Sequence, residues 1–166
     1  MEIYLLRHGI AVEREEHGGP DEERELTDEG RRKVRRVAEA MRAMKLSFDV
    51  IFSSPVARAL QTAEIVAEVL RLKRRLQLTE HLAGASPAKQ IAWLRKLRPS
   101  PASVLLVGHE PNFSELTSCL LTGRASMAIH FKKAGLCKVT ARESGSGPAT
   151  LEWFLTPKQM ELMRAK

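Results

Sequence analysis

Short apolar runs alternate with amphipathic helical patterns along most of the chain. Residues 2–6, 49–53 and 103–107 predict buried strands, and the last is apolar at nearly every position, as expected for a strand covered on both faces. Residues 76–79 fit a strand at the edge of the sheet. Between 7 and 26 the chain has many charges and little periodicity, which predicts a long loop of the kind that is often functional.

Helices are predicted between these strands. Thr27 is placed to cap a helix whose first turn carries Asp28 and Glu29, where the helix dipole favours anions. Ser54 and Pro55 predict the N-cap and the first residue of a second helix. The apolar positions recur every three or four residues, at Val34, Val37, Ala38, Met41 and Met44 in the first helix and at Ala59, Ala63, Val66, Ala67 and Leu70 in the second. Further helices are expected around 87–97, from Pro111 and near Pro157.

Strands that alternate with helices indicate βαβ units and a mostly parallel sheet. The last part of the chain differs, because 136–141 and 149–155 have the pattern of two strands joined by turn-forming residues, which predicts a hairpin. We therefore expect a three-layer α/β/α fold with a mostly parallel central sheet, helices on both faces and an antiparallel hairpin at the C-terminal edge. A length of 166 residues favours a single domain over 1–166.

Composition narrows the possible functions. With 43% hydrophobic and 28% charged residues the chain is an ordinary globular protein, and no apolar run approaches the length of a membrane span. The net charge of +7 favours anionic partners, namely phosphorylated substrates, acidic proteins or nucleic acid. The 5% aromatic content and the lack of a reader motif argue against nucleic acid. Cys119 and Cys137 lack metal-site or disulfide spacing, which is typical of reduced thiols in a cytoplasmic protein.

Four cationic or titratable side chains follow the predicted strands. Arg7 and His8 follow the first strand, Arg58 lies in the first turn of the helix after the second, and His109 follows the strand at 103–107. In an open α/β sheet, ligands bind at the carboxyl ends of the strands, so these groups are expected on one rim. Two arginines suit a phosphate dianion, and a histidine can attack phosphorus to form a covalent intermediate. The pattern predicts phosphoryl-transfer chemistry.

These residues also carry a family resemblance. The N-terminal strand followed by Arg7-His8-Gly9 resembles the signature of the histidine phosphatase superfamily, which has the phosphoglycerate mutase-like fold. Further motifs stand in the family's order, and they are Leu26-Thr27-x-x-Gly30, Ser53-Ser54-Pro55-x-x-Arg58-Ala59-x-Gln61-Thr62-Ala63 and Val107-Gly108-His109. The small size and the end of the chain are most similar to the SixA-type phosphohistidine phosphatases.

The resemblance implies a role for each matching position. His8 corresponds to the phosphorylated nucleophile, Arg7 and Arg58 to phosphate-binding arginines, and His109 to the second active-site histidine. Arg24 corresponds to a further phosphate-contacting arginine. Glu80 falls where related enzymes place a proton donor, although the residues after it depart from the mutase pattern. The family needs no metal or other cofactor, and none is expected here.

The short span between Glu80 and the strand at 103 leaves little chain for a lid, so we expect an open site that admits a phosphorylated side chain of a protein. The resemblance favours phosphohistidine as the substrate, and inorganic phosphate or sulfate as an occupant of the site. Nucleic acid and membranes are not expected partners. Three alternatives stay open: a broad small-molecule phosphomonoesterase, a non-catalytic phosphate-binding module, and a basic nucleic-acid binder.

Overall fold

The computed structural model describes residues 1–142 and 147–164 and has one six-stranded sheet. The strand order is β3-β2-β4-β1-β5-β6. Strands β1 to β4 are parallel, whereas β5 runs antiparallel to both β1 and β6. The strand bounds are β1 Glu2–Arg7, β2 Val50–Ser53, β3 Leu76–Leu78, β4 Ser103–Gly108, β5 Leu136–Thr140 and β6 Thr150–Leu155. The predicted mostly parallel sheet with a C-terminal antiparallel hairpin is confirmed.

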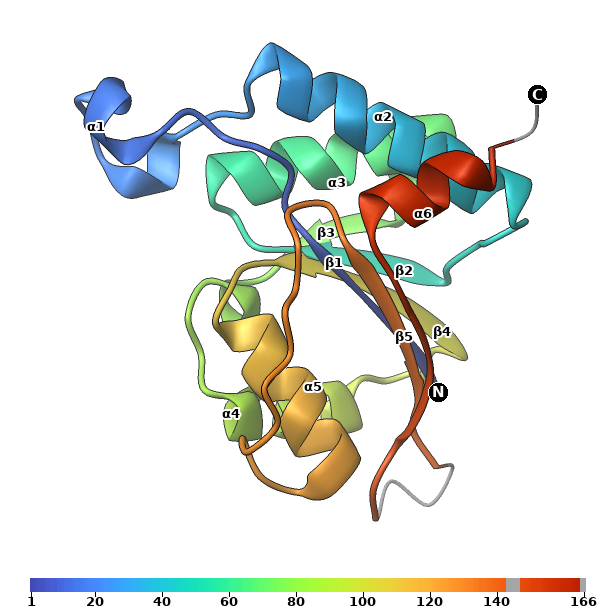
Figure 1. Ribbon diagram of the computed structural model, residues 1–166. Helices are drawn as coiled ribbons and strands as arrows, with labels where there is room; N and C mark the ends of the chain where they lie inside the picture. The colour runs from blue at the N-terminus through green and yellow to red at the C-terminus, as the bar shows by residue number, and fades with distance from the viewer. Residues whose placement is uncertain (143–146, 165–166) are drawn as a thin grey trace.

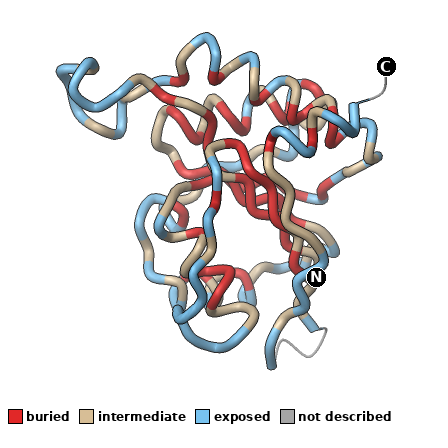
Figure 2. The backbone as a smooth tube through the Cα atoms, in the orientation of Figure 1, coloured by how far each residue is buried: buried red, intermediate tan, exposed pale blue. Residues whose placement is uncertain are grey.

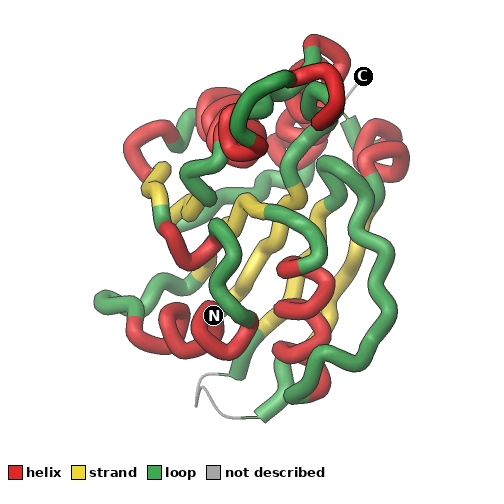
Figure 3. Tube along the Cα trace, turned by 90° about the vertical axis from the view of Figure 1, so that its left-hand side faces the viewer, coloured by secondary structure: helices red, strands yellow, loops and turns green. Residues whose placement is uncertain are grey.

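Helices cover both faces of the sheet, as Figure 1 shows. Helices α2 (Asp28–Ala43), α3 (Ala57–Val69) and α6 (Pro157–Leu162) lie on one face, and α4 (Pro87–Lys96) and α5 (Asn112–Thr122) lie on the other. A quarter turn shows the strands side by side between the two helical layers (Figure 3). The short elements α1 (Arg14–His17), η1 (Asp21–Glu23), η2 (Lys73–Arg75) and η3 (Glu80–Leu82) lie in the connections. The expected three-layer α/β/α arrangement is therefore present.

The central strands divide their side chains between two cores. In β1, Tyr4 and Leu6 pack towards α2, α3 and α6, whereas Ile3 and Leu5 pack towards α4 and α5. Strand β4 alternates in the same way and is buried along almost its whole length, as the red central segments of Figure 2 show. Full burial of one such aliphatic side chain stabilises the fold by about 1.5–3 kcal/mol. The two cores hold β1 and β4 rigidly, and both strands lead directly into the functional residues.

A close contact explains the glycine of the motif Leu26-Thr27-x-x-Gly30. The Thr27 side chain accepts a hydrogen bond from the Gly30 amide at 3.0 Å, as predicted for the N-cap of α2. A Cβ atom at Gly30 would lie only 2.0 Å from the carbonyl oxygen of Ile10. Only glycine lets the first turn of α2 approach the loop that follows His8.

Two predictions about the connections need revision. The helix α3 begins at Ala57, so Ser54 and Pro55 are not its N-cap and first residue. The Ser54 hydroxyl instead contacts His109, which draws it away from a capping position. The loop predicted at 7–26 contains the short elements α1 and η1 and a bridge between Ala11 and Leu26. Residues 143–146 of the predicted hairpin turn lie outside the described residues.

Candidate active site

Three parallel strands deliver their following residues to one edge of the sheet. Arg7 pairs in register with Gly108, and Ser53 with Val107, so β1, β2 and β4 end at the same level. Immediately beyond, the His8 amide donates to the Gly108 carbonyl and the Ser54 amide donates to the Val107 carbonyl, both at 3.0 Å. The strand ends thus place His8, Ser54 and His109 side by side, as the topology of a parallel sheet requires.

The His8 imidazole is buried and held in one orientation. Its Nδ1 lies 2.7 Å from the carbonyl oxygen of Gly9, so Nδ1 carries the proton and Nε2 keeps its lone pair. Burial, opposed by this bond and reinforced by the charges of His109, Arg58 and Arg7, lowers the pKa of His8 to about 3. At neutral pH this ring is uncharged, which is the state that a nucleophile needs.

His109 faces His8 across the site, with the ring centroids 5.2 Å apart. Burial and the charge of Arg58 lower the pKa of His109 to about 4, and this ring is also neutral at pH 7. Its Nε2 lies 3.0 Å from the Ser54 hydroxyl, which also accepts the Val56 amide at 3.3 Å. A Ser54 hydroxyl that donates to Nε2 leaves the ring proton on Nδ1, where it is available to a ligand oxygen.

The two arginines are fixed by their terminal nitrogens. Arg7 Nη1 donates to the Phe131 carbonyl at 2.5 Å. Arg58 Nη1 and Nη2 donate to the carbonyl and the carboxylate of Asp21 at 2.7 and 2.9 Å. The Nε atoms of Arg7 and Arg58 and the Nδ1 atom of His109 are buried and have no hydrogen-bond partner among the described residues. An unsatisfied buried polar group costs about 1–3 kcal/mol. Three such donors around His8 are the arrangement that an anion would satisfy.

The loop that carries His8 is anchored from two sides. The Gly9 amide donates to the Thr62 hydroxyl at 3.0 Å, and this hydroxyl donates to the Arg58 carbonyl at 2.7 Å. The amide of Ala134 donates to the carbonyls of both Arg7 and His8. Thr62 therefore ties the loop that carries His8 to the start of α3, a role that the motif alone does not reveal.

The structure brings together Arg7, His8, Arg58 and His109, but the two remaining predicted residues differ from them. Arg24 makes contacts at 2.9 Å with the Asp21 carboxylate, from both Nε and Nη2, and donates from Nη1 to the Val12 carbonyl. Glu80 lies in η3 just beyond β3 and is exposed, and its side chain makes no hydrogen bond or ion pair among the residues described. Its position at the same edge of the sheet follows from the end of β3.

Sequence reasoning missed Asp21, which contacts both Arg24 and Arg58. Its local signal is weak: it stands three residues before Arg24 in a loop that holds several other acidic residues. Ser54 was expected to be a helix cap, and its contact with His109 had no sequence signal. In the described part of the chain, no group of three His, Cys, Asp or Glu side chains is placed to hold a metal ion. Nor does any helix there have the length and apolar character needed to cross a bilayer.

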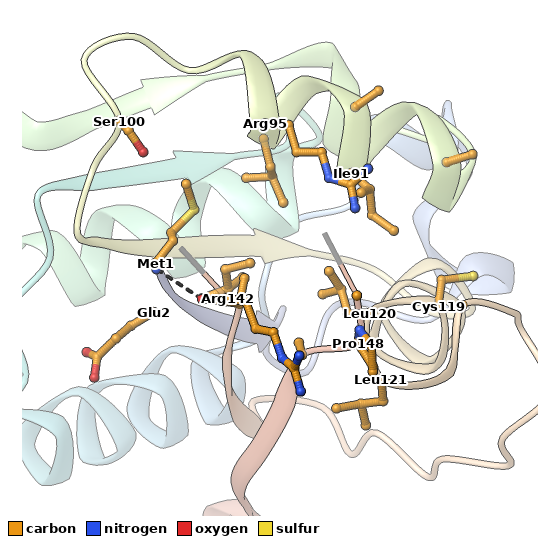
Figure 4. Close-up of a pocket in the computed structure, with 18 of the residues that line it drawn as sticks. Met1, Glu2, Ile91, Arg95, Ser100, Cys119, Leu120, Leu121, Arg142 and Pro148 are labelled. Carbon is orange, nitrogen blue, oxygen red and sulfur yellow. Dashed lines mark hydrogen bonds between the residues drawn. The ribbon is translucent and has the colours of Figure 1, made fainter. Parts of the chain in front are cut away.

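A hollow of about 1390 Å³ lies at the opposite end of β1 and β4. Figure 4 shows Met1 in this groove, where its amino group donates to the Ala141 carbonyl at 3.3 Å. Arg95, Arg98, Arg142 and Glu2 contribute charge, and most of the other lining residues are apolar. None of the predicted site residues lines this groove, so the chemistry belongs to the rim around His8.

Comparisons with known proteins show which family and which fold the chain resembles. The family model of the histidine phosphatase superfamily (branch 1) matches residues 3–86. An uncharacterized protein of Picosynechococcus sp. is 36% identical over 138 residues, which cover 82% of both chains. The phosphohistidine phosphatase SixA of Escherichia coli K12 is 28% identical over 99% of both chains. A solved structure of the protein histidine phosphatase SixA complexed with tungstate matches with a TM-score of 0.84 at 27% identity, covering 95% of this chain and 98% of that one. The fold expected from the resemblance is confirmed.

Proposed function

Because the chain belongs to the histidine phosphatase superfamily, we propose that it is a phosphatase that works through a covalent phosphohistidine at His8 and dephosphorylates phosphohistidine on other proteins. One observation carries the chemistry. The neutral His8 ring, with its proton on Nδ1, lies beside three buried N–H groups that have no partner among the described residues. A nucleophile and an unsatisfied set of anion-binding donors occupy one rim.

The first step transfers the phosphoryl group to the enzyme. The lone pair of His8 Nε2 forms a bond to phosphorus while the bond between phosphorus and the substrate nitrogen breaks. Arg7, Arg58 and His109 donate to the phosphoryl oxygens, where charge stabilisation and positioning supply most of the catalysis. In the second step water attacks phosphorus, the bond to Nε2 breaks with its electron pair returning to the ring, and inorganic phosphate leaves with the remaining proton going to solvent.

Three features support phosphohistidine as the substrate. SixA, the curated relative that aligns over nearly the whole chain, is a phosphohistidine phosphatase. A protonated imidazole is a good leaving group, so phosphohistidine, unlike an alkyl ester, does not depend on Glu80 as a proton donor. The net charge of +7 favours the approach of acidic phosphoproteins.

The proposal assigns supporting roles to Arg24 and Glu80. Arg24 binds the phosphoryl group as a further arginine, through the N–H groups that Asp21 and Val12 leave free. Glu80 protonates leaving groups that are poorer than imidazole and assists the attack of water. Neither residue forms a bond to phosphorus, and the transfer of the phosphoryl group rests mainly on His8 and the three donors around it.

A substrate panel with a trapping experiment tests the proposal. The purified protein is given a phosphohistidine-carrying protein, sugar phosphates and p-nitrophenyl phosphate, with His8→Ala as the control. We expect the highest kcat/KM on the phosphoprotein and rapid labelling that is acid-labile, alkali-stable and absent from His8→Ala. Higher kcat/KM on sugar phosphates would instead identify a small-molecule phosphomonoesterase. Phosphate binding without any label would indicate a non-catalytic binding module.

The proposal also places the protein in the cytoplasm, where thiols stay reduced. Cys119 and Cys137 are both free, and burial raises the pKa of Cys137 to about 12, which keeps this thiol unreactive. Fractionation of cells that produce the protein, with immunodetection in each fraction, tests this part. Recovery in a membrane or exported fraction would contradict it.

A further inference from the structure

The Asp21 carboxylate lies between Arg24 and Arg58 and contacts both of them. Asp21 Oδ1 accepts from Arg24, and its Oδ2 accepts from Arg58 Nη2, each at 2.9 Å. The Asp21 carbonyl accepts from Arg58 Nη1 at 2.7 Å. A single residue of the long loop thus engages Arg58 through both its main chain and its side chain, and links it to Arg24.

These contacts determine which part of Arg58 is left for a ligand. Both terminal nitrogens donate to Asp21, while Nε is buried without a partner among the described residues. The Arg58 side chain is only 11% exposed, so it has little freedom to turn. Each terminal nitrogen of a guanidinium carries two hydrogens, so Asp21 and an anion can use the same group at once.

We propose that Asp21 is a positioning residue, which holds Arg58 with its free N–H groups directed at the phosphoryl group that His8 attacks. This inference rests on the proposed function, since it assumes that Arg58 binds that group. Asp21 itself does not touch the substrate. It fixes an arginine that would otherwise be repelled by the nearby Arg24 and would have to be ordered by the ligand in every catalytic cycle.

The ionisation of Asp21 fits positioning better than proton transfer. Burial alone would raise the pKa of the Asp21 carboxyl, but its contacts with Arg58 and Arg24 outweigh burial and hold the pKa below its ordinary value. A carboxylate that stays ionised is a poor proton donor at neutral pH. Its negative charge also lowers the repulsion between the guanidinium groups of Arg24 and Arg58, and its contacts with Arg58 leave the Nε–H group of that residue unused.

The same turn supplies a matched control. Glu22 and Glu23 follow Asp21 in η1 and are exposed, and their side chains make no hydrogen bond or ion pair among the residues that the structure describes. Glu22→Gln removes the same charge from the same turn as Asp21→Asn without touching Arg58. Loss of a negative charge near an anion site by itself favours anion binding, so a purely electrostatic role and a positioning role predict opposite signs.

The test compares wild type, Asp21→Asn and Glu22→Gln. The affinity for orthovanadate is measured by calorimetry. The values of kcat and KM are measured with p-nitrophenyl phosphate as the substrate, and Tm is measured by thermal unfolding. We expect Asp21→Asn to bind vanadate more weakly and to lose roughly ten- to a hundredfold in kcat/KM, the scale of a misplaced catalytic group. Glu22→Gln should match wild type, and Asp21→Glu, which keeps the charge, should recover part of the loss.

Equal or tighter vanadate binding by Asp21→Asn would overturn the inference, because Asp21 would then merely compete with the ligand. A loss of activity that follows a lowered Tm equally in Asp21→Asn and Asp21→Glu would also overturn it, since the role would be structural. Failure of wild type to bind vanadate and to turn over substrate would instead overturn the proposed function. The two failures are therefore distinguishable.

Discussion

The imidazole rings of His8 and His109 face each other with their centroids 5.2 Å apart and their planes inclined by 51°. His8 is buried and His109 is partly buried, both lie beside Arg7 and Arg58, and both have pKa values well below the ordinary 6.5. The pair is therefore uncharged at neutral pH although it lies in a cationic environment. His8 offers a lone pair and His109 an N–H group. Because both rings are uncharged, the pairing of positive charge with an anionic ligand is left to the arginines.

This pairing predicts the response to pH. His8 and His109 have pKa values of about 3 and about 4, so both stay neutral until the pH falls well below 6. In the unfolded chain these two histidines bind protons near pH 6.5. Between pH 6.5 and about 4 the unfolded state therefore carries more protons than the folded state, and the free energy of unfolding falls as the pH falls. NMR titration of the ring protons should show no protonation of His8 above pH 5. A midpoint near 6.5 would contradict the expected environment.

Gly30→Ala should disrupt the loop that carries His8. The added Cβ would lie 2.0 Å from the Ile10 carbonyl oxygen, a backbone atom that can move only with its loop. We expect a loss of about 1–3 kcal/mol in the free energy of unfolding, measured by urea denaturation, together with lower kcat. Gly19→Ala is the control, because its Cβ would meet only the flexible His17 side chain at 3.2 Å. Equal stability of the two variants would refute the close approach.

Ser54→Ala should reduce catalysis without unfolding the protein. It removes the hydroxyl that lies 3.0 Å from His109 Nε2 and so frees the ring to change its tautomer. A neutral hydrogen bond contributes about 0.5–1.5 kcal/mol, so kcat/KM should fall roughly two- to tenfold. Ser53→Ala is the control, since the Ser53 hydroxyl donates to the Ser54 carbonyl and not to His109. A larger loss in Ser53→Ala than in Ser54→Ala would contradict this role.

Arg24 can act on the ligand directly or only through Asp21, and a double-mutant cycle separates the two. The proposed direct contact predicts that Arg24→Ala weakens vanadate binding even when Asp21→Ala is already present. If Arg24 served only to hold Asp21, the double variant would bind vanadate as the Asp21→Ala single variant does. Calorimetry on the four proteins measures the coupling. Arg31→Ala, which removes an exposed arginine that pairs with Glu25, is the control.

The parts of the site that follow strands were predictable, and the parts in irregular loops were not. Arg7, His8 and His109 follow apolar runs whose parallel pairing brings their ends together. Asp21 lies where the chain has no hydrophobic period, so nothing local shows that it turns back to Arg58. Ser54 and Pro55 are residue types that favour a helix start, but the helix begins at Ala57 and the Ser54 side chain contacts His109 instead.

Glu80→Gln should separate substrates by their leaving groups. The Glu80 side chain is exposed in η3 and has no partner among the described residues, so it is free to serve as a proton donor. An alkoxide needs a proton as it departs, whereas the imidazole of protonated phosphohistidine does not. We expect the variant to lose roughly a hundredfold or more in kcat on an alkyl phosphate, within the range for general acid catalysis, and to lose less on phosphohistidine, for which only the assistance to the attack of water is removed. Glu64→Gln, an exposed position of α3, is the control. Equal losses on both substrates would show that Glu80 acts on hydrolysis of the phosphoenzyme rather than on the leaving group, because that second step is common to every substrate.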